Sequence, residues 1–216
     1  MNLRELIKQF RVLSKDMVRK YLWPDEELIP WFAEAEKEAA QRARLIRDSD
    51  EITLSVGDKS CDLPSGMFDV QYAELRAVDG TVYEIHATDY VELTTTRPGW
   101  RTKSDRPREF IDNGDGTLTL GYVCDAAYTL YVEGFRTPKN PLSSEGDEPE
   151  IAEDHHSKLV DWVLFRAYSK PDVDTLNPGK SADGEDRFTK HFGKRLNADL
   201  RRRQNASRPH RNRCHL

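Results

Sequence analysis

Long apolar runs and paired cysteines are both missing from this 216-residue sequence. No stretch approaches the roughly 18 consecutive apolar residues of a membrane-spanning helix, and the N-terminus carries no signal-peptide core. The three cysteines, Cys61, Cys124 and Cys214, are an odd number without CxxC spacing, which argues against a disulfide framework or a zinc finger. We therefore expect a soluble protein that is made in a reducing compartment and has no membrane partner.

The motifs of common enzyme sites are missing as well. The sequence contains no GxGxxG, GxxxxGK[ST] or GxSxG, and no pair of carboxylates stands in a recognisable catalytic frame. The segment NGDGTLTL at 113–120 is similar to a calcium loop in composition, but it lacks the spaced acidic ligands and final glutamate of an EF-hand. Turn chemistry explains this segment. We expect no catalytic residue, no metal and no cofactor.

Charge is unevenly distributed along the chain. The formal net charge of −5 does not indicate a general nucleic-acid binder. However, residues 187–216 hold ten Lys/Arg and one acid, whereas residues 145–154 hold six acids and no base. Such a separation of acidic and basic charge between segments indicates an interaction tail.

The basic charge is densest in residues 201–216, where no acid occurs and apolar residues are too few to form a core. We expect this segment to be disordered alone and to become ordered on a partner. An acidic groove on a partner protein and the phosphates of a nucleic acid are the two candidate targets. The arginines concerned are Arg201, Arg202, Arg203, Arg208, Arg211 and Arg213.

Hydrophobic periodicity predicts helices at both ends of the chain and strands between them. Apolar residues recur every three or four positions over 3–17 and again over 28–46, so a first helix should end near Trp23-Pro24 and a second should follow. After Asp48 the period changes to two. Asp79-Gly80 and the run 113–116 are turn sequences that predict antiparallel hairpins.

The predicted fold class is α+β: a four-helix bundle, built from two N-terminal and two C-terminal helices, with an antiparallel β insertion between helices 2 and 3. The expected divisions are an N-terminal helical pair (1–48), the β insertion (49–137), a polar connector (138–148), a C-terminal helical pair that completes the bundle (149–204) and a basic C-terminal arm (205–216).

The segment EIAEDHH at 150–156 invites interpretation as a metal site. On a helix, His155 and His156 are about 100° apart and point in different directions, whereas two ligands on one face need a spacing of three or four. Glu153 and His156 have that spacing, but no third or fourth ligand is evident nearby. We interpret the segment as a helix N-terminus whose acids complement the helix dipole. A metal-dependent hydrolase centred on Glu153, Asp154 and His156 is the least favoured alternative.

The residues that follow are almost entirely apolar. Eight of the ten residues from Leu159 to Tyr168 are apolar, and a helix that is apolar on nearly all sides is buried on nearly all sides. Four short helices could hardly cover so much apolar surface. We therefore expect Trp162, Phe165 and Tyr168 to contact a neighbouring subunit.

Four stretches together resemble the head-to-tail adaptor (head-completion, connector) proteins of tailed bacteriophages. They occur in the family's order and cover most of the chain. The sequence departs from the family pattern at His155, where an aromatic residue is usual, and near Cys61, where a tyrosine is usual. The stretches are WPDEELIPWFAEAEKEAAQRARLI (23–46), ITLSVGDKSCDLPSGMFDV (52–70), PEIAEDHHSKLVDWVLFRAYSKPDVDTLNP (149–178) and FTKHFGKR (188–195).

The resemblance implies a structural virion protein without catalysis. It implies a ring, typically twelvefold, that docks beneath the portal, joins the DNA-filled head to the tail and passes DNA through its lumen. Expected partners are the portal protein, neighbouring adaptor subunits, a downstream tail or stopper protein, and genomic DNA. The protein would lie in the host cytoplasm during assembly and then in the virion, with the arginine arm bound to the portal. The main alternative is a DNA-binding regulator or packaging factor that uses the basic C-terminal tail.

Overall fold

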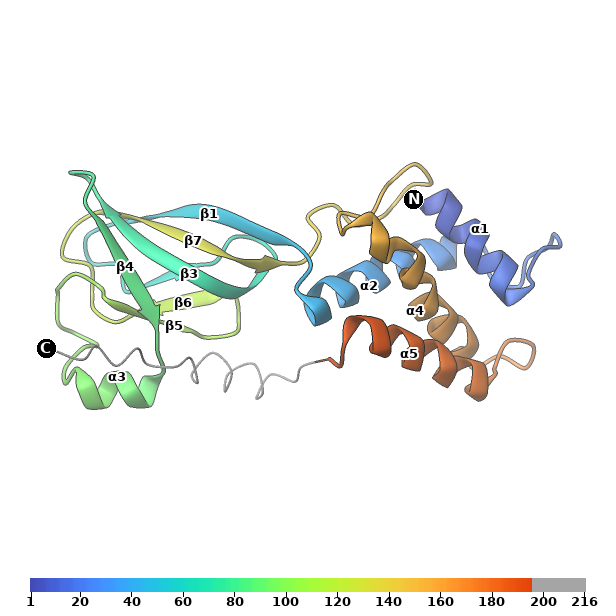
Figure 1. Cartoon of the computed structure of the whole chain (residues 1–216). Coiled ribbons are helices and arrows are strands. Elements are labelled where there is room, and N and C mark those ends of the chain that lie inside the picture. The colour runs from blue at the N-terminus through green and yellow to red at the C-terminus, as the bar shows by residue number, and fades with distance from the viewer. Residues whose placement is uncertain (196–216) are drawn as a thin grey trace, which may run out of the picture. The chain divides into compact units, whose positions relative to one another are not determined.

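The computed structural model describes residues 1–195, and these residues divide into two compact units (Figure 1). The helical unit comprises residues 1–46 and 136–195, and the sheet unit comprises residues 47–135. Each unit has its own buried apolar cluster. The chain therefore leaves the helical unit once, builds the sheet unit, and returns.

The helical unit is arranged around one helix. Its helices are α1 (Leu3–Ser14), α2 (Asp25–Ala43), α4 (His156–Ser169) and α5 (Pro178–Phe192), and a 3-10 turn (Glu153–His155) precedes α4. Helix α4 packs on each of the other three (Figure 1). This position explains its sequence, because a helix surrounded by others is apolar on nearly every side.

A glycine lets α4 and α5 approach closely. Gly184 lies within α5, and a Cβ atom there would stand 2.8 Å from the carbonyl oxygen of Asp161 and 2.8 Å from the amide nitrogen of Phe165. Both distances are shorter than van der Waals contact, so the backbone of α4 occupies the space that a larger side chain would need. The same close approach brings the rings of Trp162 and Phe188 together, with centroids 5.0 Å apart.

Helix α1 ends at Ser14, well before the predicted end near Trp23-Pro24. Lys15 follows with a φ angle of 63°, in the left-handed region that terminates helices. The carboxylate of Asp16 then accepts hydrogen bonds from the backbone N–H groups of Leu22 (3.0 Å) and Trp23 (3.4 Å). The prediction was wrong because apolar residues continue at helical spacing beyond the end of the helix. This spacing does not show which of them are buried.

Residues 138–148 form a connector that packs on the start of α1. The first backbone N–H groups of a helix have no partner within it, and here those of Leu3 and Arg4 donate to the carbonyl oxygens of Asp147 (2.8 Å) and Glu145 (3.0 Å). Leu142 of the connector is buried in the helical core. The connector is therefore part of the helical unit.

The sheet unit is built from seven strands in the spatial order β1-β7-β3-β4-β5-β6-β2. The hairpins predicted at Asp79-Gly80 and at 113–116 are confirmed, because β3 pairs antiparallel with β4 and β5 pairs antiparallel with β6. The strands are β1 (Arg47–Leu54), β2 (Ser60–Asp62), β3 (Met67–Ala77), β4 (Val82–Ala87), β5 (Glu109–Asp112), β6 (Thr117–Leu120) and β7 (Tyr128–Arg136).

Strands β4 and β5 run parallel, with His86 opposite Glu109. A parallel pair needs a crossover connection, and this one contains α3 (Tyr90–Thr96). The Asp89 side chain caps α3 by accepting hydrogen bonds from the N–H groups of Val91 and Glu92, both at 2.8 Å. Threonine-rich segments favour strands by propensity, so the periodicity of the sequence did not indicate this helix.

The predicted fold class is therefore wrong. The sheet is mixed rather than antiparallel, and its seven strands form a compact unit of their own. Residues 1–195 contain five α-helices, and the helical unit is organised around α4 instead of forming a four-helix bundle. Periodicity identified most strands but not their neighbours, because pairing across a sheet depends on contacts between distant parts of the chain.

Candidate functional site

The three aromatic residues assigned to a subunit contact lie on α4. Trp162 and Tyr168 are buried within the helical unit, with 6% and 7% of their surface exposed, whereas Phe165 is half-buried. The ring of Trp162 contacts that of Phe188, and the ring of Tyr168 contacts that of Trp23, at centroid distances of 5.0 and 5.4 Å. The chain itself thus covers most of the surface that we expected a neighbour to cover. Contact of these residues with a second subunit stays a prediction.

The arginines assigned to portal binding lie outside the residues that the structure describes. Their binding to the portal, or to DNA, stays a prediction. They are Arg201, Arg202, Arg203, Arg208, Arg211 and Arg213.

The acids and histidines before α4 do not come together as a metal centre. His156 is buried, and its Nε2 and Nδ1 atoms lie 2.8 Å from the carbonyl oxygen of Ile151 and 3.1 Å from that of Met1. The ring of His155 faces His191 instead, with Nδ1 and Nε2 3.0 Å apart. Within residues 1–195, no group of three or more His, Cys, Asp or Glu side chains is placed to hold a metal ion.

The two cysteines of the sheet unit are free thiols. Burial raises the pKa of both Cys61 and Cys124 to about 11. Since the thiolate is the nucleophilic form, the raised pKa disfavours nucleophilic reaction of both thiols at neutral pH. Cys214 lies outside the described residues.

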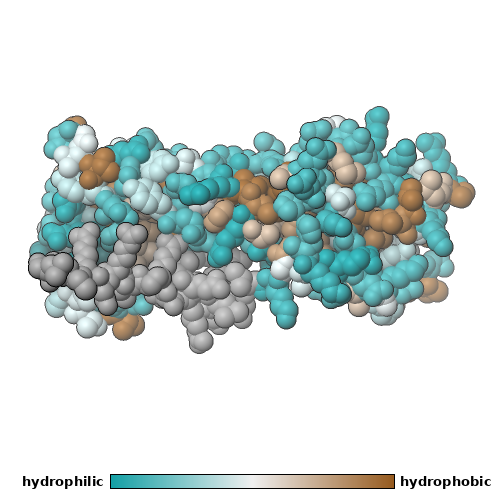
Figure 2. Space-filling model, in the orientation of Figure 1, coloured by the Kyte–Doolittle hydropathy of each residue, from teal (hydrophilic) through white to brown (hydrophobic). Residues whose placement is uncertain are grey.

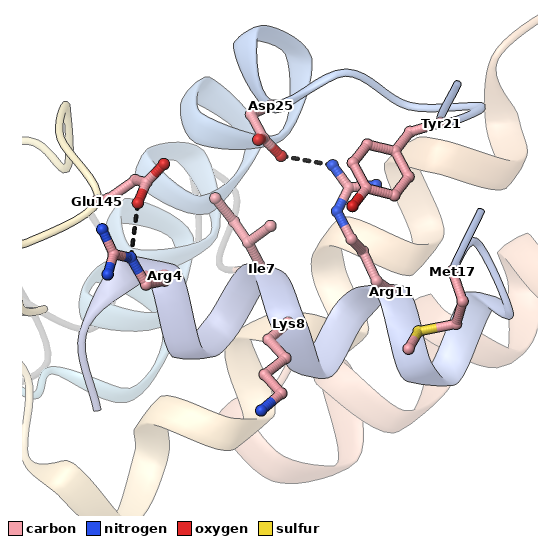
Figure 3. Close-up of a pocket in the computed structure, with 8 residues that line it drawn as sticks. All are labelled: Arg4, Ile7, Lys8, Arg11, Met17, Tyr21, Asp25 and Glu145. Atoms are coloured by element: carbon pink, nitrogen blue, oxygen red, sulfur yellow. Dashed lines mark hydrogen bonds and ion pairs between the residues drawn. The ribbon is translucent and has the colours of Figure 1, made fainter. Parts of the chain in front are cut away.

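The turn between α1 and α2 (residues 15–24, hereafter the α1–α2 turn) has the features of a binding surface. A buried ion pair holds its backbone: the guanidinium of Arg11 lies 2.9 Å from the carboxylate of Asp16. Arg11 also donates to the carbonyl oxygen of Trp23 (3.2 Å) and to the carboxylate of Asp25 (2.5 Å; Figure 3). Removing one partner of a buried ion pair costs on the order of 3–5 kcal/mol. The pair therefore strongly favours this conformation of the turn.

The end of α4 supports the same turn. The indole N–H of Trp23 donates to the carbonyl oxygen of Ala167 at 3.3 Å. The ammonium of Lys170 pairs with the carboxylate of Glu27 at 2.9 Å. The α1–α2 turn is therefore attached to the core of the helical unit.

The outer face of this turn exposes large apolar side chains. Of the twelve large hydrophobic residues that are exposed within 1–195, seven belong to the end of α1, the α1–α2 turn or the loop after α4. Figure 2 shows apolar residues in brown where this end of the helical unit lies. Clustered apolar exposure marks an interaction surface. We define the apolar end by these seven residues: Val12, Leu13, Met17, Val18, Leu22, Val173 and Leu176.

A half-open pocket borders the apolar end at Met17 (Figure 3). Inside it, Arg4 pairs with Glu145 at 2.6 Å, and the ring of Tyr21 lies on the guanidinium of Arg11, whose Cζ atom is 3.5 Å from the ring centroid. The pocket is lined by Arg4, Ile7, Lys8, Arg11, Met17, Tyr21, Asp25 and Glu145.

The exposed charges around the apolar end are of both signs: the α1–α2 turn carries cations, and Asp172 and Asp174 are exposed on either side of Val173. Lys15, Arg19 and Lys20 are exposed, and none of them has an ion pair with a described residue. The one acid of the turn, Asp16, is buried against Arg11. An apolar centre with a charged rim suits a protein surface that is apolar at its centre and charged at its edge. The arrangement provides contacts for binding, and its lining residues include no nucleophile beside a base.

Apolar spacing by itself assigns Leu13 and Met17 to the buried stripe of α1, and so it misses this surface. A signal was present in the charged pair Lys15-Asp16, which interrupts the stripe. It does not show where the turn lies in the folded chain.

The apolar end is therefore a candidate protein-binding surface. The model of the SU10 adaptor protein family matches residues 1–213, and the chain therefore belongs to that family. The resemblance to phage head-to-tail adaptors is thereby confirmed. A search of curated proteins finds no match.

Membership of this family gives the chain a structural adaptor role in a bacteriophage virion, where it interacts with other head and tail proteins. No helix within residues 1–195 has the length and apolar character needed to cross a membrane.

Proposed function

We propose that the chain is the subunit of a ring, typically twelvefold, that docks beneath the portal and joins the DNA-filled head to the tail. The ring has a lumen through which the DNA passes, and it carries no catalytic activity. Its partners are the portal protein on one side and a tail or stopper protein on the other. The observation that carries the proposal is the apolar end, a rigid and exposed protein-binding surface on a chain of an adaptor family.

The rigidity of the apolar end supports docking. The ion pair between Arg11 and Asp16 orders the α1–α2 turn before any partner binds, so less conformational entropy is lost on binding. Repetition around a ring would multiply a modest contact, because neighbouring copies bind the same partner at high effective concentration. A small apolar patch on each subunit is then sufficient for stable docking of the ring.

Two further contacts belong to the proposal. The arginine arm, from Arg201 to Arg213, binds the portal. Trp162, Phe165 and Tyr168 contribute to the contact between subunits, with Phe165 the most exposed of the three.

Docking is tested with a pair of charged substitutions in the apolar end. Val18→Asp with Leu22→Asp places two carboxylates on side chains that are 77% and 52% exposed, so the protein should stay folded. Burying an unpaired carboxylate at an interface is strongly unfavourable. We expect wild-type protein to add a ring of density to DNA-free portal rings in electron micrographs, and the double variant to leave the portal bare.

The matched control is Val78→Asp with Val91→Asp, which adds the same charge at exposed positions of the sheet unit and should dock normally. A separate variant, truncated after Leu200, tests the arginine arm. Normal docking by the Val18/Leu22 variant would show that the apolar end does not contact the portal. Failure of the wild-type protein to bind either portal or tail protein would contradict the adaptor function itself.

A further inference from the structure

A second charged surface lies in the sheet unit, in the connection between α3 and β5. Residues 97–108 hold five basic residues and one acid, Asp105. Lys59, from the loop between β1 and β2, joins them because its ammonium donates a hydrogen bond to the carbonyl oxygen of Arg101. We define the basic cluster as Lys59, Arg101, Lys103, Arg106 and Arg108.

Aromatic rings hold these cations in place. Trp100 is 2% exposed, and the Nζ atom of Lys59 and the Cζ atom of Arg101 each lie 4.6 Å from its ring centroid. The Cζ atom of Arg106 lies 3.8 Å from the ring centroid of Tyr83. A guanidinium stacked on a ring keeps its in-plane N–H groups free to donate to an anion. The cluster is therefore ordered before a ligand binds.

The Trp100 ring is itself anchored. Its indole N–H donates to the hydroxyl oxygen of Thr94 in α3 at 3.3 Å. The ring packs in a small buried cluster with Leu93, Ile111 and Tyr122. The cations that contact Trp100 are therefore held in place by the packed part of the sheet unit.

Much of this positive charge has no counter-charge. Lys103 pairs with Asp105 at 3.5 Å, but Lys59, Arg101 and Arg106 have no ion pair with a described residue. Burial and the nearby charge of Arg101 lower the pKa of the Lys59 ammonium. Two like charges held side by side repel each other, and a bound anion would relieve that repulsion.

The surroundings of the cluster indicate the class of anion. Within residues 97–108 no large apolar side chain is exposed, although Tyr90 of α3 is 45% exposed and its ring centroid lies 6.1 Å from that of Trp100. Protein interfaces have an apolar core, whereas nucleic-acid interfaces are more polar and much more positively charged. A surface where cations outnumber the exposed apolar side chains therefore fits a chain of phosphates better than an apolar protein surface.

We propose that the basic cluster binds the phosphate backbone of DNA. The inference rests on the proposed function only for the presence of DNA, because the cluster lies within one chain and needs no ring. Phosphate contacts carry no sequence information, so binding is independent of base sequence. Each phosphate that is neutralised releases counterions, so binding weakens as salt rises.

The test compares two charge-matched double variants of the full chain. Lys59→Gln with Arg101→Gln removes two cations from the cluster, and Arg19→Gln with Lys20→Gln removes two from the α1–α2 turn. Fluorescence anisotropy of a labelled duplex of about 20 base pairs gives the slope of log K against log salt. We expect the first variant to make the slope shallower by roughly 2, and the second to leave it unchanged. The arginine arm is present in both variants, so its contribution cancels.

Equal slopes for the two variants would overturn the proposal. It would also be overturned if a polyglutamate peptide bound as tightly as DNA and with the same dependence on Lys59 and Arg101, because the partner would then be an acidic protein. If the double variant fails to fold by circular dichroism, Arg101→Gln alone repeats the test at an exposed position. Portal docking by the Lys59/Arg101 variant should be normal, so failure here is distinguishable from failure of the adaptor function.

Discussion

At the scale of the residue, buried polar groups connect the segments of the helical unit by hydrogen bonds. Glu36 on α2 is 1% exposed, and its carboxylate accepts a hydrogen bond from the backbone N–H of Glu150 at 2.5 Å. Its second oxygen has no hydrogen-bond partner among the described residues. Burial is the main reason that the pKa of Glu36 is raised to about 7. This one carboxyl group thus links α2 to the segment that leads into α4.

The raised pKa predicts a pH dependence of stability. The folded protein holds the Glu36 proton up to a pH of about 7, whereas the unfolded chain releases it near the ordinary value of 4.5. The free energy of unfolding should therefore fall as pH rises between these values and then level off. Glu36→Gln keeps the hydrogen bond and removes the titration. In urea unfolding, we expect little change near pH 5 and a gain of up to about 3 kcal/mol above pH 7.

Glu34→Gln is the matched control for this prediction. Glu34 lies on the same helix, is more exposed, and pairs with Arg166 at 3.2 Å. Its loss should change stability by a similar small amount at both pH values. An equal effect of Glu36→Gln at both pH values would mean that the carboxyl group does not titrate as its burial requires.

At the scale of the element, the distance between helices α4 and α5 depends on a single glycine. Gly184 lets the backbone of α5 lie against that of α4 near Asp161 and Phe165. Glycine in a helix is unfavourable by about 1 kcal/mol relative to alanine. Its presence inside α5 is explained by the close contact that it permits. The packing of the two helices therefore outweighs the intrinsic preference of the residue.

Gly184→Ala should destabilise the protein although it improves helix propensity. A Cβ atom at 2.8 Å from backbone atoms of α4 forces the helices apart, and such overpacking costs about 1–3 kcal/mol. Gly179→Ala is the control, because its Cβ would meet only the side chain of Asn177 at 3.5 Å. We expect this control to be neutral or slightly stabilising in denaturant unfolding. A Gly184→Ala protein as stable as the control would show that α4 and α5 can separate without loss.

At the scale of the whole molecule, the two units have separate cores. One apolar cluster contains the buried residues of the helices, and another contains those of the sheet. Within residues 1–195, two chain crossings, near residues 46 and 136, connect the units. The stability of each unit is thus determined largely by its own contacts.

Replacing Gly114 and Gly116 by valine should disturb the sheet unit and spare the helical unit. Both glycines have positive φ angles, 75° and 91°, which valine strongly disfavours. We expect the helical signal in circular dichroism to persist while the β5–β6 turn is disrupted. Gly146→Val is the control, because Gly146 is exposed, has open space around it and is not among the glycines with positive φ. Complete loss of the helical signal in the double variant would show that the units unfold as one.

By itself the sequence determined the family, most of the helices and strands, and the two hairpin turns. These features are local, because periodicity reflects which face of an element is buried, and Asp-Gly or Asn-Gly pairs reflect backbone angles that few other residues adopt. The resemblance also followed from the order of motifs along the chain, which needs no three-dimensional information.

Only the tertiary structure showed which strands, helices and side chains lie next to one another. The parallel pairing of β4 with β5 and the burial of Trp162 both depend on residues that are distant in the sequence. The same holds for the two proposed surfaces, since a side chain such as Val18 or Arg101 has the same local pattern whether it is covered or exposed. Exposure is a property of the packed chain, and the sequence pattern does not record it.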